Sequence, residues 1–217
     1  MVVPLHDGRI FICGGTSEPK CWVEIYDPEK GGFDRRDLPD DILNPFPSSC
    51  FLWADQSVML YYTKISIKEQ VCKPSLLLYD VERNNWKIFA ENLPDSKSYD
   101  LEKRMLIYVG GNILFIIDQA SCWFVYDLST RKVVGKVDVR VEDGEVMQAL
   151  YLGNNDIKNI SWIFYIFMPD VSHRYGYSDL RHAKVEVVQD KGGDYTAIVQ
   201  LSSSESWLPY RPLYYCR

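Results

Sequence analysis

The side chains that most often bind metals are few in this sequence and are not grouped. The histidines are His6, His173 and His182, of which His6 precedes the first apolar run and the other two flank an irregular stretch, residues 170–181. No H-E-x-x-H, H-x-E or C-x-x-C motif occurs, so the sequence lacks the ligand spacings typical of protein metal sites. The sequence therefore predicts no metal site and no cofactor.

Residue patterns typical of hydrolases and phosphate-binding proteins are missing as well. The sequence has no G-x-S-x-G nucleophile motif and no Gly-rich phosphate loop. The acidic pair Asp40-Asp41 stands in a connector flanked by Pro and Asn, and residues 142–145 have the composition of a charged turn. We therefore expect no enzymatic activity. A small-molecule or sugar enzyme remains an alternative, because catalytic residues can converge in space without a sequence motif.

The composition is that of a globular protein with an excess of acidic residues. The 217 residues include 24 basic and 30 acidic side chains, and 47% of them are hydrophobic. A pI near 5.1 argues against nucleic acid or an anionic membrane as partner, because both repel a net-negative chain. The longest unbroken apolar run, residues 162–168, is much shorter than the about 20 residues of a membrane-spanning helix. These features favour a protein partner.

The N-terminal residues and the cysteines indicate a reducing compartment. His6, Asp7 and Arg9 lie within the first ten residues, and no apolar signal-peptide core is present. The six cysteines are scattered, and four of them stand beside bulky apolar or aromatic residues. This distribution is typical of buried, reduced thiols. We therefore expect a cytoplasmic or nuclear protein.

The secondary-structure elements that the sequence predicts are mostly short strands, and these would position any functional residue. No segment keeps a 3.6-residue apolar period over three turns, whereas short runs rich in Val, Ile, Tyr, Phe and Trp recur between turn residues. This pattern predicts an all-β sandwich, barrel or propeller. The expected strands are residues 9–13, 23–26, 50–53, 58–62, 76–79, 86–89, 105–109, 113–117, 123–126, 133–137, 146–152, 162–167, 183–188 and 195–201.

A repeat of about 50 residues organises these runs. Three of the runs end in a Tyr-Asp pair, and the successive pairs are 53 and 47 residues apart. A bulky residue follows six positions after each Asp. The three sets are Tyr26, Asp27 and Phe33; Tyr79, Asp80 and Trp86; and Tyr126, Asp127 and Val133.

A fourth, weaker unit completes the repeat. Residues 183–188 occupy the place of the Tyr-Asp strand, and Tyr195 stands where the aromatic residue is expected. We predict a single domain with approximate units 1–40, 41–95, 96–140 and 141–205, followed by a tail, residues 206–217.

The repeat unit predicts a β-hairpin. The Asp is placed to accept hydrogen bonds from N–H groups of the turn, and the following aromatic residue can pack across the hairpin on the Tyr. Gly14 and Gly15, after the first inner strand, would let the backbone pass where a Cβ would clash. We expect Gly110-Gly111 and Gly192-Gly193 to form turns. A unit with two apolar faces must stack on its neighbours to bury both.

The run 10–15, followed by Tyr26-Asp27 and Phe33, resembles a kelch repeat, as do residues 78–80 with Trp86. The units are similar to those of plant F-box/kelch-repeat proteins of the galactose oxidase/kelch superfamily, without the F-box. The resemblance covers residues 8–137 best, and Tyr61-Tyr62 and Val133 depart from it.

The resemblance implies a kelch-type β-propeller of about four recognisable blades, which is either incomplete, part of a longer gene product, or an unusually small ring. A WD40 propeller has a shorter period and a Trp-Asp dipeptide that this sequence lacks. A Greek-key sandwich would explain the strands without explaining the period.

The resemblance also implies a protein–protein interaction module, with substrate recognition for a cullin-type ubiquitin ligase as its specific role. Propellers bind partners through loops at one end, and the candidate loops here are residues 16–20, 64–73, 119–121 and 170–181. A truncated or degenerate kelch paralogue with little independent function is the other alternative. The loop at residues 64–73 is long and basic, and its candidate binding residues are Lys64, Lys68 and Lys73. The last loop supplies Arg174, Tyr175, Tyr177 and Arg181, an Arg/Tyr-rich mixture of the kind enriched at protein interfaces.

Overall fold

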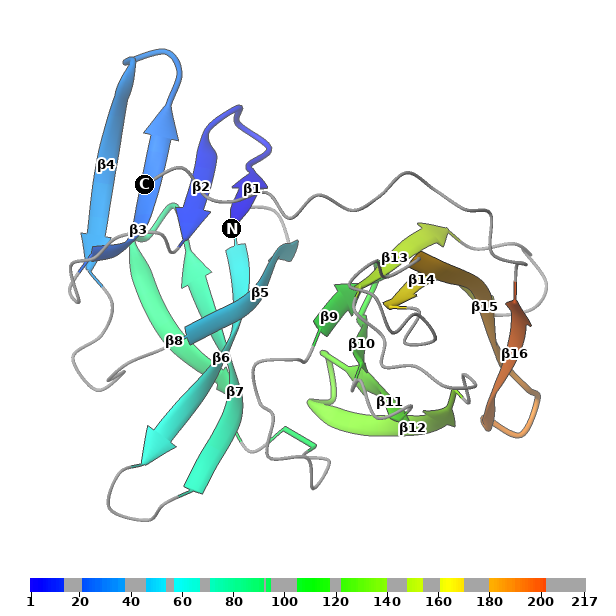
Figure 1. The fold of residues 1–217 in the computed structure, drawn as a ribbon. Coiled ribbons are helices and arrows are strands. Elements are labelled where there is room, and N and C mark those ends of the chain that lie inside the picture. The colour runs from blue at the N-terminus through cyan, green and yellow to red at the C-terminus, as the bar shows by residue number, and fades with distance from the viewer. Residues whose placement is uncertain are drawn as a thin grey trace. The chain divides into compact units, whose positions relative to one another are not determined.

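The computed structural model describes residues 1–13, 21–37, 46–53, 57–66, 71–91, 93–94, 105–117, 122–139, 148–153, 161–169 and 180–201. Within these ranges the chain forms sixteen strands and no helix, and the strands make four four-stranded antiparallel sheets (Figure 1). The all-β prediction is confirmed, and the sheets are consistent with blades of a kelch-like propeller. The chain divides into two compact units, Met1–Glu102 and Lys103–Arg217. The single-domain organisation stays a prediction.

Unit 1 contains two sheets, each built from four consecutive strands that pair in chain order. Sheet A consists of β1 (Val2–Pro4), β2 (Ile10–Cys13), β3 (Cys21–Asp27) and β4 (Gly32–Asp37). Sheet B consists of β5 (Phe46–Trp53), β6 (Ser57–Ser66), β7 (Val71–Asp80) and β8 (Asn85–Ala90).

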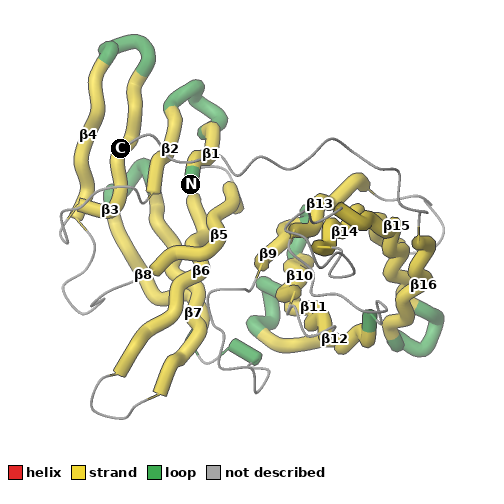
Figure 2. The backbone as a smooth tube through the Cα atoms, viewed as in Figure 1, coloured by secondary structure: helices red, strands yellow, loops and turns green. Residues whose placement is uncertain are grey.

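Unit 2 repeats this arrangement (Figure 2). Sheet C consists of β9 (Met105–Tyr108), β10 (Ile113–Ile117), β11 (Cys122–Asp127) and β12 (Lys132–Asp138). Sheet D consists of β13 (Gln148–Gly153), β14 (Ser161–Pro169), β15 (Leu180–Gln189) and β16 (Tyr195–Leu201).

Every strand expected from the sequence is present, but two edge strands, β1 and β4, were not expected. The sequence of β4, GFDRRD, is mostly charged and exposed. An edge strand hydrogen-bonds on one side and faces solvent on the other, so its side chains need not be apolar. The two predicted Gly-Gly turns are confirmed. Between β9 and β10, Gly110 and Gly111 adopt φ angles of 96° and 60°, and between β15 and β16 Gly193 donates to Asp190 O.

The core of unit 1 lies between sheets A and B. Side chains that alternate along β2 and β3 point towards sheet B, and those that alternate along β6 and β7 point towards sheet A. The rings of Phe11 and Tyr79, both with no exposed surface, lie 5.7 Å apart at the centre of this contact. The alternation predicted from the sequence therefore selects which face of each strand enters the core.

The core of unit 2 lies between sheets C and D and is rich in aromatic rings. Phe115 of β10 packs against Phe164 and Trp162 of β14, at ring centroid distances of 4.8 and 5.3 Å. Trp123 of β11 meets Phe164 edge to face at 5.1 Å. Aromatic pairs in this geometry stabilise a core beyond the area that they bury.

One glycine of unit 2 is required by close packing between the outer strands. Gly135 on β12 lies under the ring of Tyr195 on β16, and a Cβ added at Gly135 would come within 2.1 Å of that ring. Tyr195 in turn stacks on Trp162 at 6.0 Å, so the ring has little room to move away.

We predict that Gly135→Ala destabilises the protein by about 1–3 kcal/mol, because the added methyl overpacks this contact. Urea unfolding followed by tryptophan fluorescence measures the loss. In a chain that already carries Tyr195→Ala, Gly135→Ala should lower the free energy of unfolding only slightly. Gly32→Ala is the matched control, since among the described residues nothing beyond its chain neighbours lies within 4 Å of the new methyl. A Gly135→Ala protein as stable as the natural one would contradict this prediction.

Candidate functional site

The Tyr-Asp repeat forms the predicted hairpin in the structure. Tyr26 lies opposite Phe33 in the register, with ring centroids 4.9 Å apart, and Tyr79 lies opposite Trp86 at 4.4 Å. Tyr126 takes the same place opposite Val133. The prediction that the aromatic residue packs across the hairpin on the Tyr is confirmed for the first two units.

The Asp of each repeat holds the turn that follows it. Asp27 Oδ1 accepts hydrogen bonds from the N–H groups of Glu29 and Lys30, at 3.0 and 3.3 Å. Asp80 Oδ1 accepts one from Arg83 N at 3.0 Å, and Asp127 Oδ1 accepts one from Ser129 N at 2.7 Å. These carboxylates are therefore structural acceptors within their turns, as predicted.

Asp190 is the equivalent residue in sheet D, and the sequence analysis missed it. Its Oδ1 accepts hydrogen bonds from Gly192 N and Asp194 N, at 2.8 and 2.9 Å, and Gln189 lies opposite Tyr195 in the register. Gln189 replaces the Tyr of the repeat and the turn is one residue shorter, so the pattern is hidden. The remaining signal is an Asp that follows a strand and precedes Gly-Gly and an aromatic residue.

The topology separates these turns from the predicted binding loops. In each sheet, the turn after the first strand and the turn after the third strand lie at one edge, because consecutive strands are antiparallel. We call this end of the sheet the turn edge. The second and third strands connect at the opposite end of the sheet, which we call the loop edge. In sheet B the paired ends of β6 and β7, Ser66 and Val71, mark this edge (Figure 1).

Three of the candidate binding residues lie on strands, so their assignment to loops was wrong. Lys64 on β6 lies opposite Lys73 on β7, and Arg181 on β15 lies opposite Met168. The lysines alternate with Ile65 and Cys72, a pattern that a strand accommodates as readily as a loop does. Outside the described residues lie Lys68, Arg174, Tyr175, Tyr177, Gly14 and Gly15.

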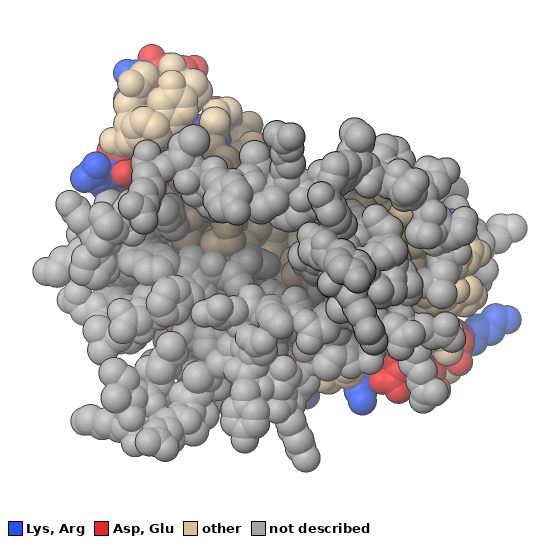
Figure 3. Space-filling view, in the orientation of Figure 1, with Lys and Arg blue, Asp and Glu red and all other residues tan. Residues whose placement is uncertain are grey.

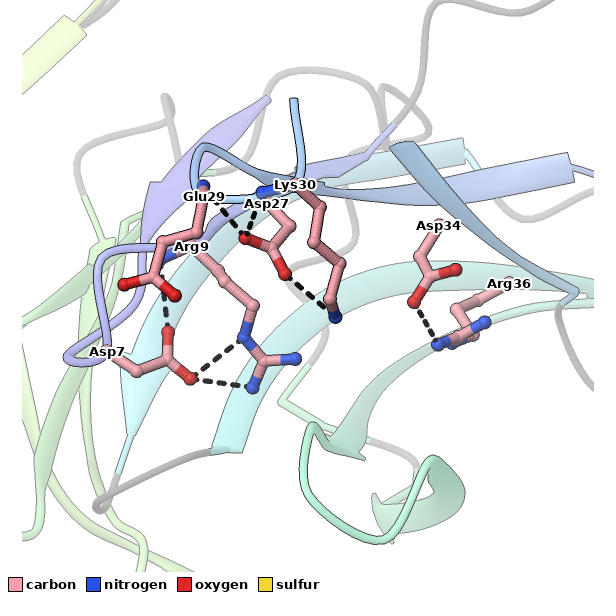
Figure 4. A network of polar contacts seen from close by, with 7 residues as sticks. All are labelled: Asp7, Arg9, Asp27, Glu29, Lys30, Asp34 and Arg36. Carbon is pink, nitrogen blue, oxygen red and sulfur yellow. Dashed lines mark hydrogen bonds and ion pairs between the residues drawn. The ribbon is translucent and has the colours of Figure 1, made fainter. Parts of the chain in front are cut away.

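A network of charged residues at the turn edge of sheet A was not found from the sequence (Figure 4). Asp7 Oδ2 accepts hydrogen bonds from Nε and Nη2 of Arg9, at 2.9 and 2.6 Å. Asp27 pairs with Lys30 at 3.0 Å, and these residues line a depression of about 240 Å³. Acidic and basic atoms also lie together over the end of the β3–β4 hairpin (Figure 3). No local signal reports this network, because two separate turns supply it.

The cations beside the carboxylates of this depression hold them in the ionised form. The hydrogen bond from Arg9 lowers the pKa of Asp7, and the Lys30 side chain lowers the pKa of Asp27. Both carboxylates are therefore ionised near neutral pH and are matched by the cations beside them. Neither carboxylate can act as a general acid at that pH.

A second contact connects sheet A to sheet B. Arg36 on β4 pairs with Asp34 at 2.8 Å, and its hydrogen bond to the Tyr79 hydroxyl opposes the rise in the pKa of Tyr79 that burial causes. Tyr79 donates to Asn84 Oδ1 at 2.8 Å. The hydroxyl of Tyr79, the Tyr of the second repeat, is therefore held between the two sheets.

Two of the described thiols, those of Cys13 and Cys50, are poorly reactive. Burial raises the pKa of Cys13 to about 12 and that of Cys50 to about 11, so both thiols are protonated near neutral pH. Within the part of the chain that the structure describes, no group of three or more His, Cys, Asp or Glu side chains could hold a metal ion. The described residues also include no helix long and apolar enough to cross a membrane.

Comparison with known families agrees with the hairpin geometry. Residues 1–34 match the family model of the kelch motif. The chain carries a kelch motif. The matched range runs from β1 into β4 and so includes the kelch hairpin with Tyr26, Asp27 and Phe33. No curated protein matches the chain. The kelch resemblance is thus supported, whereas the likeness to plant F-box/kelch proteins stays a prediction.

The turn carboxylate of Asp127 gives the β11–β12 hairpin a predicted pH dependence. The hydrogen bond from the Ser129 hydroxyl, at 2.6 Å, and those from the N–H groups of Ser129 and Thr130 lower the pKa of Asp127 from 3.8. A carboxylate with a lowered pKa contributes stability above its unfolded-state pKa, and this contribution is lost as the pH falls through the folded-state value.

We therefore expect Asp127→Asn to lower the Tm at pH 7, and the difference from the natural protein to shrink as the pH falls below 3.8. Thermal unfolding followed by circular dichroism across this range measures both effects. Asp138→Asn is the control, because that carboxylate is largely exposed and should change the Tm little at any pH. A difference that does not depend on pH would refute this role of Asp127.

Proposed function

We propose that this chain is a kelch-type protein-interaction module that binds an acidic segment of its partner. The kelch motif at residues 1–34 is the observation that supports an interaction module. The repetition of the same hairpin device at Asp27, Asp80, Asp127 and Asp190 extends this support over all four sheets. The turns hold the scaffold, which leaves the loop edge to bind.

The charge pattern at the loop edge of sheet B supports an acidic partner. Lys64 and Lys73 lie directly opposite each other in the register, and Lys68 falls in the segment that joins β6 to β7. An acidic segment of a partner would complement these three lysines, and Glu69 is the only acidic residue between positions 64 and 73.

The net charge of the chain favours a protein over other anionic partners. A net charge of −6 repels nucleic acid and anionic membranes at long range, whereas a short acidic segment meets the lysines locally. In this proposal Arg174, Tyr175, Tyr177 and Arg181 make a second contact with the partner, in which the Tyr rings supply apolar area.

We predict that Lys64→Glu, Lys68→Glu and Lys73→Glu together weaken binding of a fluorescein-labelled deca-glutamate peptide at least tenfold, measured by fluorescence anisotropy at low salt. The reversed charges would repel the acidic probe. The matched control reverses three exposed lysines elsewhere, Lys132, Lys136 and Lys191, and should bind as the natural protein does. Both triple variants should keep the Tm of the natural chain. Equal binding by all three proteins would remove the lysines from the proposal.

For the specific role, we propose substrate recognition for a cullin-type ubiquitin ligase in the cytoplasm or nucleus. This role rests on the resemblance of the Tyr-Asp-x6-Trp units to plant F-box/kelch proteins. Affinity purification of the tagged chain from source cells, followed by mass spectrometry, tests it. We expect ligase subunits to co-purify and to do so equally with the lysine-reversed variant, since the lysines would contact the substrate. Recovery of chaperones alone would favour a degenerate paralogue.

A further inference from the structure

Sheet A carries an apolar face that no sheet of its own unit covers. On the side away from sheet B, Val2 lies opposite Ile12, and Ile10 lies opposite Tyr26, which in turn lies opposite Phe33. We call these five residues the outer face of sheet A. Val2 and Phe33 are 65% and 59% exposed, which is unusual for apolar side chains on a regular sheet.

The corresponding face of sheet B shows how such a surface is normally used in this chain. There the Tyr79–Trp86 pair packs against sheet A, and Tyr79 has no exposed surface. Phe11 of sheet A lies 5.7 Å from the Tyr79 ring. The Tyr26–Phe33 pair of sheet A is built in the same way, with ring centroids 4.9 Å apart, but no such neighbour occurs among the described residues of unit 1.

Sheet D carries the complementary open face. On the side away from sheet C, Leu150 lies opposite Tyr165, and Ile163 and Ile198 both lie opposite Glu186. We call Leu150, Ile163, Tyr165 and Ile198 the outer face of sheet D. Leu150 and Ile198 are 46% and 51% exposed.

Inside each unit, a sheet face that bears a Tyr of the hairpin packs on a face that does not. The two outer faces are one of each kind. In unit 1, the face of sheet A opposite its Tyr26–Phe33 pair packs on the face of sheet B that carries Tyr79. In unit 2, the face of sheet C opposite Tyr126 packs on the face of sheet D that carries Tyr195. The outer face of sheet A is a Tyr-bearing face, and the outer face of sheet D is its usual counterpart.

The charges on the two faces also match. Glu24 and Arg35 pair at 3.3 Å on the outer side of sheet A. Lys184 and Glu186 lie on the outer side of sheet D, opposite Tyr165 and Ile163 in the register. Each face thus offers one acid and one base, so contact between them would pair opposite charges at the border of an apolar patch.

We propose that the outer face of sheet A docks on the outer face of sheet D of a second copy of this chain. The contact is heterologous, because the two copies contribute different surfaces. It buries the apolar residues that the isolated chain exposes and leaves the loop edge outside the contact. The proposal goes beyond the proposed function and does not depend on it.

Sedimentation velocity of the full chain over a hundredfold concentration range tests the proposal. We expect concentration-dependent association of the natural chain, and monomers for Phe33→Lys and for Ile198→Lys, because each variant places an unpaired cation in the contact. Both positions are largely exposed, so each variant should fold, with a Tm lowered for Phe33→Lys only by the lost contact with Tyr26. The matched control is Val134→Lys on β12, an apolar residue 42% exposed that belongs to neither face, and it should associate normally.

A mixing experiment distinguishes this contact from others. The Phe33→Lys variant keeps an intact sheet D face, and the Ile198→Lys variant keeps an intact sheet A face, so an equimolar mixture should form one heterodimer. Association of either variant alone would indicate contact between like faces and overturn the proposal. A natural chain that stays monomeric throughout the range would overturn it as well.

Discussion

Each four-stranded sheet of this chain carries apolar side chains on both faces, and the rest of the structure follows from this constraint. In sheet B, Leu60 and Leu77 are buried on the side of sheet A, while Met59 and Leu78, their neighbours along the same strands, are buried on the opposite side. Water would cover both faces of a sheet that stood alone, at a cost of roughly 25 cal/mol for each Å² of apolar surface. Within each unit the sheets therefore pack face to face, A on B and C on D.

A hairpin held by an Asp recurs in each sheet. The Asp at the end of the third strand holds the turn, and the residue across the hairpin fills the space beside the Tyr or its replacement. In sheet D the same place is occupied by Tyr195, whose ring lies over Gly135 of sheet C and stacks on Trp162. The polar part of the repeat thus fixes the turn and the apolar part makes contact between sheets. The Asp and Tyr side chains of the repeat are thus engaged in contacts within the scaffold.

Two pairs of ionisable side chains are likewise held by their surroundings. The carboxylates of Asp7 and Asp27 are matched by Arg9 and Lys30, and the thiols of Cys13 and Cys50 are held protonated by burial. A kelch motif at residues 1–34 and a loop edge that brings Lys64 opposite Lys73 point to recognition through surfaces. The exposed outer faces of sheets A and D extend the same principle, because they are packing surfaces of the kind that the chain buries elsewhere.

The sequence by itself determined the class of fold, the positions of most strands and the Tyr-Asp hairpins. These features are encoded within about ten consecutive residues, by alternation of apolar side chains and by the chemistry of the turn. The tertiary structure decided what depends on residues far apart in the chain. The edge strand β4 is recognisable only beside β3, since its own residues are charged, and the continuation of β6 and β7 to Lys64 and Lys73 depends on the pairing of one strand with the other. The contact of Gly135 with Tyr195 and the network around Arg9 join different strands and turns, and such contacts leave no periodic signal in the sequence.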